Sequence, residues 1–187
     1  LRPVRNWILS GYYDVWQHPW LRFDADAPSR GHEYRLRVTH FKKRKYEAYV
    51  EFRDETKEKN VPLFETKTNW PVPSRVFQTR FHFGYQLSKA LELRSRADFG
   101  FSDNEINNRQ SGFVIYQDIL FHPIQFPVSF TARFALMDTD GYQARFYSFE
   151  NNLLYQFSIP AYYNEGVRYY LNVRFKGIRN MTVDRHR

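Results

Sequence analysis

The sequence contains no cysteine, which excludes a disulfide framework, a thiolate metal site and a cysteine nucleophile. Glycine and methionine are also scarce, with 8 and 2 residues in a chain of 187. No stretch approaches the roughly 18 consecutive apolar residues of a membrane helix, and the mean hydropathy is −0.69. These absences exclude a helical membrane protein.

The sequence also lacks motifs for catalysis and for metal binding. Its six histidines are scattered, without the spacing of a zinc site. A hydrolytic site that combines His82 or His122 with an aspartate such as Asp118 would need a nucleophile motif, and no Gly-x-Ser-x-Gly is present. Asp138–Gly141 begins like a calcium loop without its further acidic ligands, so we predict a tight turn whose glycine has a positive φ. We therefore expect no enzyme, no cofactor and no metal.

Aromatic residues and positive charge are abundant. Phenylalanine, tyrosine and tryptophan make up 19% of the chain, a composition that favours strands over helices. The net charge is +8 and the isoelectric point about 9.7. Such a charge permits nucleic acid, lipid head groups, lipopolysaccharide or anionic solutes as partners, and does not choose among them.

Polar and apolar residues alternate with period two along most of the chain, which is typical of β-strands. From Arg75 to Tyr85, residues such as Phe77 and Phe81 fall on one face, and residues such as Arg80 fall on the other. The runs with this clear alternation are 33–40, 46–53, 75–85, 91–101, 128–136 and 167–176. Further strands are expected at 7–15, 20–27, 112–121, 143–149 and 152–159, with a last one from Met181.

Strand length and connection length both favour an outer-membrane barrel. Many runs have about ten residues, enough for a tilted strand to cross the hydrocarbon layer, whereas globular strands centre on about five or six. Connections also alternate between short and long, as in these barrels. The short connections are 17–19, 42–45, 86–90, 123–127 and 177–180, the long ones are 55–74, 102–111 and 160–166, and a further turn is required at 150–152. We predict an all-β, antiparallel transmembrane β-barrel of about 10 to 12 strands.

In such a barrel the apolar face contacts lipid and the charged face lines the lumen. Mutual ion pairs that brace a plugged lumen are the favoured interpretation, and an anion-selective pathway is the alternative. A soluble lipocalin-like barrel would show the same alternation with its aromatic face inside. Because aromatic and basic residues lie on opposite faces, we expect no nucleic-acid contact through this region. The candidate lumen-lining residues are Arg35, Arg37, Glu51, Arg53, Arg80, Glu92, Arg94, Arg96, Arg133, Arg168 and Arg174.

Four stretches carry a resemblance to a known family: Phe23–Tyr34, Ser111–Pro123, Ala132–Ala161 and Arg168–Phe175. Together they resemble the C-terminal barrel region of outer-membrane proteins of Bacteroidota that carry an N-terminal helix-hairpin-helix segment. The resemblance implies an outer-membrane location and supplies no catalytic or ligand residues. The helix-hairpin-helix segment is absent here, and residues 184–187 lack the final aromatic residue of such barrels, so we expect a missing or shortened last strand.

The expected function is therefore structural. Residues 1–187 would form a single outer-membrane barrel region, the C-terminal part of a longer chain. We expect it to anchor or build an outer-membrane assembly, in contact with lipid, lipopolysaccharide and other outer-membrane proteins. A passive anion-preferring pore is the first alternative, and a soluble lipocalin-like ligand-binding barrel is the second.

Overall fold

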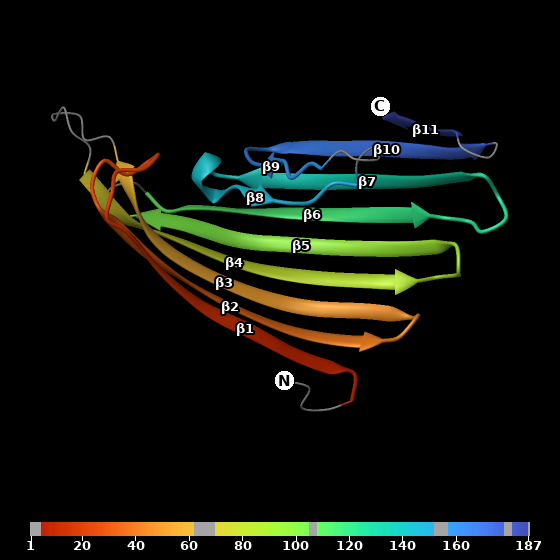
Figure 1. Cartoon of the computed structure of the whole chain (residues 1–187), viewed down its shortest axis with the longest axis horizontal. Helices are drawn as coiled ribbons and strands as arrows, with labels where there is room; N and C mark the ends of the chain where they lie inside the picture. The colour runs from red at the N-terminus through yellow and green to blue at the C-terminus, as the bar shows by residue number, and fades with distance from the viewer. Residues whose placement is uncertain (1–4, 62–69, 105–107, 152–156, 178–180, 187) are drawn as a thin grey trace.

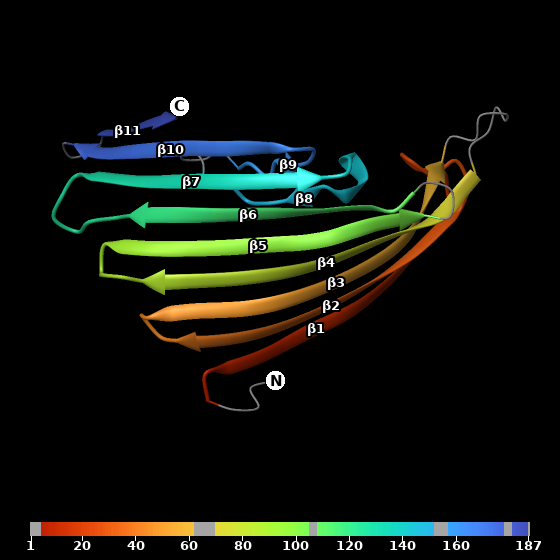
Figure 2. The same cartoon turned by 180° about the vertical axis from the view of Figure 1, so that it is seen from behind.

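Nine antiparallel strands form one large, curved sheet in the computed structural model of the chain (Figures 1 and 2). Their order across the sheet follows the sequence, except that β7 pairs directly with β10. The residues that the structure describes are 5–61, 70–104, 108–151, 157–177 and 181–186. The strands of the large sheet are β1 (Trp7–His18), β2 (Ser29–Lys42), β3 (Tyr46–Val61), β4 (Trp70–Gln86), β5 (Leu91–Asn104), β6 (Gln110–Phe121), β7 (Val128–Thr139), β10 (Gly166–Gly177) and β11 (Met181–His186).

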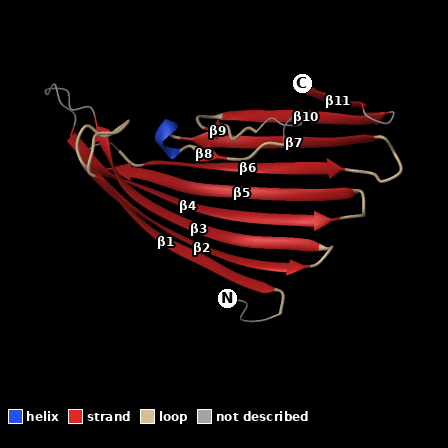
Figure 3. Ribbon diagram, viewed as in Figure 1, coloured by secondary structure: helices blue, strands red, loops and turns tan. Residues whose placement is uncertain are grey.

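A second, smaller layer comes from the connection 140–165 between β7 and β10. It contains the short 3₁₀ helix η1 (Tyr142–Ala144) and a two-stranded sheet of β8 (Phe146–Tyr147) and β9 (Ala161–Tyr162) (Figure 3). Phe146 and Tyr162 are almost fully buried, and they cluster with residues of β6 and β7 such as Tyr116. The small core of the molecule therefore lies between the large sheet and this connection.

The prediction of an all-β, antiparallel fold is confirmed, whereas a closed barrel is not observed. Among the described strands, β1 and β11 are unpaired with each other and form the two edges of an open sheet. Eleven strands fall within the predicted number, although two of them stand outside the large sheet. The last strand, β11, has 6 residues, against 12 to 17 in the other strands of that sheet. None of the described residues belongs to a helix that is long and apolar enough to cross a membrane.

Several strands extend beyond the alternation that predicts them. β3 and β4 pair as far as Val61 and Trp70, so the predicted long connection 55–74 is mostly strand. Pro71 and Pro73 lie inside β4, where the clear alternation is lost. Alternation reports which side chains are buried, and backbone pairing can continue where that contrast ends.

The predicted strand 20–27 is wrong, and the short turn predicted at 17–19 is wrong with it. β1 runs to His18, and the connection 19–28 folds into turns with an isolated bridge between Arg22 and Ala25. Asp24 has a φ of 67°, which interrupts an extended strand. Its carbonyl oxygen accepts a hydrogen bond from the Asn60 N–H at 2.9 Å, so the connection is tied to the end of β3.

The predicted strand 143–149 is also wrong, because this segment leaves the large sheet. Only Phe146–Tyr147 is extended, and it pairs with Ala161–Tyr162. Met137 of β7 pairs with Gly166 of β10, which leaves no place between these strands. For the predicted strand 152–159, residues 152–156 lie outside the described residues, and Ser158 forms an isolated bridge with Glu150.

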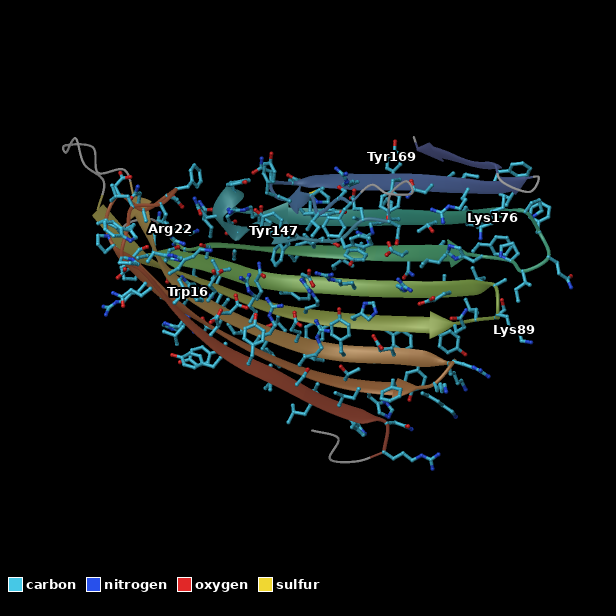
Figure 4. The ribbon with its side chains drawn as sticks, viewed as in Figure 1. Trp16, Arg22, Lys89, Tyr147, Tyr169 and Lys176 are labelled. Atoms are coloured by element: carbon cyan, nitrogen blue, oxygen red, sulfur yellow. The ribbon has the colours of Figure 1, made fainter. Side chains whose placement is uncertain are left out.

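The predicted alternation of short and long connections is seen only in part, because the connection 105–109, predicted to be long, is shorter than 122–127, predicted to be short. Lys89 and Lys176 mark the end of the sheet with the short connections, and Arg22 lies at the opposite end (Figure 4). The short connections are 43–45, 87–90, 122–127 and 178–180. The connections at the opposite end are 19–28, 62–69, 105–109 and 140–165. The connection 140–165 joins β7 to β10 directly, so the turn predicted at 150–152 is not needed to bring the chain back into the large sheet.

Candidate functional site

The large sheet has one apolar face, which is exposed. Cross-strand partners share a face, so pairs such as Leu36 with Phe52 place the apolar side chains of successive strands side by side. On β10, Tyr169 is 78% exposed and points away from the molecule (Figure 4). The large apolar residues exposed on this face include Leu36, Phe52, Phe81, Phe83, Phe99, Ile115, Ile119, Phe134, Leu136, Val167, Tyr169 and Leu171.

The opposite face, which we call the charged face, carries all eleven candidate lumen-lining residues. The row of cross-strand partners Arg37, Glu51, Arg80 and Asp98 runs over four strands of this face. Arg133 pairs with Asp118 on one side and with Tyr170 on the other. The connection 140–165 partly covers the charged face and buries some of its charged side chains. The apolar face, in contrast, is uncovered.

One ion-pair network lies on β2 and β3, at the end of the sheet with the long connections. Arg53 Nη2 is 2.8 Å from a carboxylate oxygen of Glu33 and 2.8 Å from one of Glu55. Arg35 adds a contact of 3.0 Å to Glu33, which also accepts a hydrogen bond from the Tyr12 hydroxyl. Both glutamates are at most 8% exposed, so the arginines neutralise buried carboxylates.

A second network crosses the middle of the charged face from β2 to β5. Arg37 Nε donates to Glu51 at 2.7 Å, and Arg80 contacts both Glu51 at 3.4 Å and Asp98 at 3.0 Å. Arg96 closes the chain of contacts with a distance of 2.6 Å to Asp98. Glu51 and Asp98 are 4% and 2% exposed, so three of the predicted cations serve two buried acids.

Arg133 joins the large sheet to the connection 140–165. Its Nε and Nη2 lie 2.6 Å and 2.7 Å from the two carboxylate oxygens of Asp118. Its Nη1 donates to Ser148 Oγ at 3.1 Å and to the Phe149 carbonyl oxygen at 2.9 Å. The guanidinium lies 3.9 Å from the ring centroid of Tyr116. Because Arg133 is only 4% exposed, these contacts form a desolvated clamp.

Glu150 provides a second attachment of this connection. Its carboxylate accepts two hydrogen bonds from Arg168 of β10, at 2.7 Å and 2.8 Å, and one from the Tyr162 hydroxyl at 2.7 Å. Burial, together with the hydrogen bond to Glu150, raises the pKa of the Tyr162 hydroxyl. The Asn151 N–H donates to the Tyr170 hydroxyl at 3.2 Å. Side chains of β10 therefore hold the middle of the connection on the charged face.

Asp140 fixes the start of the connection. Its carboxylate accepts hydrogen bonds from the Ser111 N–H at 2.7 Å and the Ser111 hydroxyl at 2.8 Å, which hold the pKa of Asp140 below its ordinary value. The predicted positive φ at Gly141 is wrong, because its φ is 170°. An added Cβ at Gly141 would come within 2.8 Å of Gln110 Oε1, the end of a flexible side chain that would have to shift.

The sequence identifies the cations of this site better than their partners. Arg94 pairs with Glu92 at 2.6 Å, and Arg35, Arg37, Arg53, Arg80, Arg96, Arg133 and Arg168 have the acidic partners named above. Asp118, named above only as a candidate for a hydrolytic site, pairs with Arg133. It lies in the predicted strand 112–121, which lacks the clear alternation that would have assigned it to the charged face. No pattern in the sequence points to Glu150 or Ser148, because their contacts depend on how the connection 140–165 folds back onto the sheet. Among the described residues, no three histidine, aspartate or glutamate side chains are grouped to hold a metal ion.

Comparisons with known proteins find no match for this chain: no family model, no curated protein and no solved structure is similar to it.

Proposed function

We propose that this chain forms the wall of a transmembrane β-barrel in a bacterial outer membrane, where it acts without catalysis as a membrane anchor or as a structural component of an outer-membrane assembly. The observation that carries the proposal is the arrangement of the faces: large apolar side chains are exposed and carboxylates are buried. Exposing so much contiguous apolar surface to water is unfavourable, and soluble monomers avoid it. In a bilayer the same face is solvated by lipid.

Strand length supports the same proposal. A tilted transmembrane strand needs about 9 to 11 residues, and the strands from β1 to β10 in the large sheet have 12 to 17. The short connections would face the periplasm and the long connections the outside, as in other outer-membrane barrels. A soluble lipocalin-like barrel is supported less well, because its apolar face would be the enclosed one.

The charged face is partly covered and rich in ion pairs, which supports the function of an anchor in preference to that of an open channel. Carboxylates hold candidate arginines such as Arg53, Arg80 and Arg96. Arg133 and Arg168 bind the connection 140–165, which narrows the space over the charged face. A passive anion-preferring pore remains the second candidate, and one cavity favours it. This cavity of about 580 Å³, at the end with the short connections, is lined by more cations than acids: Arg37, Lys42, Lys43, Arg44, Lys45 and Arg94 against Glu47 and Glu92.

The proposed partners follow from the location. Lipid would contact the apolar face, and lipopolysaccharide and other outer-membrane proteins would be neighbours in the assembly. The resemblance to barrel regions of Bacteroidota proteins suggests the bacterial group. We propose no nucleic-acid contact through this region, because most basic side chains of the strands lie on the charged face, opposite the exposed aromatic side chains. Lys42 and Arg75, near strand ends, are exceptions.

Reconstitution of the full-length protein into planar lipid bilayers tests the proposal and separates its two forms. We expect a protein that needs detergent or lipid to stay dispersed and that inserts without steady conductance. Steady conductance with anion preference would show that the protein acts as a pore and not as an anchor. A monomer that stays dispersed in detergent-free buffer would overturn the membrane location.

A further inference from the structure

A hollow interrupts the apolar face near the end with the short connections. It has a volume of about 460 Å³ and lies over β2 to β6. Small side chains leave the space: Ala48 on β3, and Ser95 and Ala97 on β5. Larger apolar side chains, among them Phe81 and Phe83 on β4, border it. The hollow is therefore almost entirely apolar and opens on the side of the sheet opposite the charged face.

Aromatic residues border the hollow on the side of the short connections. The rings of Trp7 and His40 are 4.5 Å apart between centroids, and the Tyr46 hydroxyl lies 3.2 Å from His40 Nδ1. Trp7 and His40 line the hollow, and Tyr46 is two residues from Ala48, toward the β2–β3 turn. In membrane proteins, such aromatic clusters with a polar atom lie at the level of the lipid head groups.

Positive charge lies next to this aromatic cluster. Lys42 is the cross-strand partner of Tyr46 and so shares the face with His40. Lys43, Arg44 and Lys45 complete the turn, and the side chains of all four are exposed. The same four residues also border the cavity that Arg37 and Arg94 line on the charged face, so the turn lies at the rim between the two faces. No described carboxylate forms an ion pair with any of these four cations. An apolar hollow, an aromatic border and a group of cations thus follow one another along β2 and β3.

We propose that this surface binds one anionic phospholipid of the leaflet on the side of the short connections, with an acyl chain in the hollow and the phosphate at Lys42–Lys45. The inference rests on the proposed membrane location and adds a specific lipid site to it. An apolar chain fits the lining, which offers almost no polar group, and only an anionic head group complements the turn. A basic residue near a membrane surface contributes about fivefold to binding of anionic lipid.

Quenching of Trp7 by brominated lipid tests the site in the full-length protein. Trp16, Trp20 and Trp70 are changed to Phe, and the protein is reconstituted with phosphatidylglycerol or phosphatidylcholine that carries bromine on its acyl chains. We expect phosphatidylglycerol to quench Trp7 at a lower mole fraction than phosphatidylcholine. Lys42→Gln and Lys45→Gln should each reduce this preference by up to about fivefold, whereas the control Lys176→Gln, on β10, should leave it unchanged.

A second variant tests the hollow independently of charge. Ala97→Leu fills part of the hollow with apolar atoms, so we expect weaker quenching by phosphatidylglycerol with no change in net charge. Equal quenching by both lipids in the protein with native Lys42 and Lys45 would overturn the lipid site and leave the membrane location intact. Shielding of Trp7 from both lipids in a bilayer-embedded protein would also overturn it, in favour of a second protein chain on this surface. Failure to associate with vesicles at all would instead refute the proposed function.

Discussion

At the scale of single residues, the buried pair of Arg133 and Asp118 should contribute most to stability. Arg133→Met leaves the Asp118 carboxylate, 3% exposed, without its counter-ion, and we expect a loss of about 3 to 5 kcal/mol in the free energy of unfolding. Urea unfolding of the full-length protein in vesicles measures it. The half-exposed pair of Arg94 and Glu92 supplies the control: Arg94→Met should cost less than about 1 kcal/mol. Equal effects of both substitutions would contradict this ranking, and adding Asp118→Leu to Arg133→Met should restore most of the loss.

The Asp140 carboxylate should make stability depend on pH in acid. Its hydrogen bonds with Ser111 lower its pKa in the folded state below the ordinary value of 3.8. The resulting stabilisation is present above that ordinary value and is lost as the pH falls through the lowered pKa. The difference in unfolding free energy between the native protein and Asp140→Asn should therefore shrink as the pH is lowered from about 6 to about 2. Ser111→Ala, which keeps the backbone N–H, should remove only part of the effect, and a difference that is constant with pH would contradict the prediction.

Residue identities on the charged face could be predicted because alternation assigns each strand residue to one of two faces. The ion-pair partners of these residues could not be predicted, because they depend on the register between neighbouring strands. Arg80 contacts both Glu51 and Asp98 only because β3, β4 and β5 align these three positions. The partner of Arg168, Glu150, lies in a connection whose path no periodicity describes.

At the scale of elements, the connection 140–165 should protect its buried residues from solvent. Since the chain has no native cysteine, Ala144→Cys gives a single thiol at a position 3% exposed. We expect it to react with a soluble maleimide more than about tenfold slower than the neighbouring exposed Gln143→Cys. Adding Glu150→Gln, which weakens the attachment to Arg168 and Tyr162, should accelerate labelling of Cys at 144 and not at 143. Equal labelling at the two sites would mean that the connection does not rest on the charged face.

Strands and connections differ in how far the sequence predicts them. The run from Arg75 to Tyr85 lies within β4 because its neighbours β3 and β5 are equally amphipathic and bury the same face. Residues 20–27 and 143–149 have similar aromatic content without a neighbouring strand of the large sheet to pair with, and Phe146–Tyr147 pairs only with the short strand β9. Residues 19–28 are instead held at Asp24 by Asn60, and 143–149 by Arg133, both through contacts distant in sequence.

At the scale of the whole molecule, a charge on the apolar face should be costly in a membrane and nearly neutral in water. Phe99 is 43% exposed in the middle of β5. If lipid surrounds this face, Phe99→Arg should destabilise the protein in vesicles by about 2 to 4 kcal/mol. The same substitution at Phe126, in the connection 122–127, should cost much less because that residue lies outside the strands. A change within about 0.5 kcal/mol at Phe99 is what a water-exposed surface would give, and it would contradict the membrane location.

The edge strands β1 and β11 run in the same direction, because nine strands alternate in direction across the sheet. Pairing these edges directly would create a parallel contact, whereas every other contact in the sheet is antiparallel. Bacterial single-chain barrels contain an even number of antiparallel strands. An antiparallel cylinder that includes these nine strands therefore requires an odd number of additional strands between β11 and β1, whichever polypeptide contributes them.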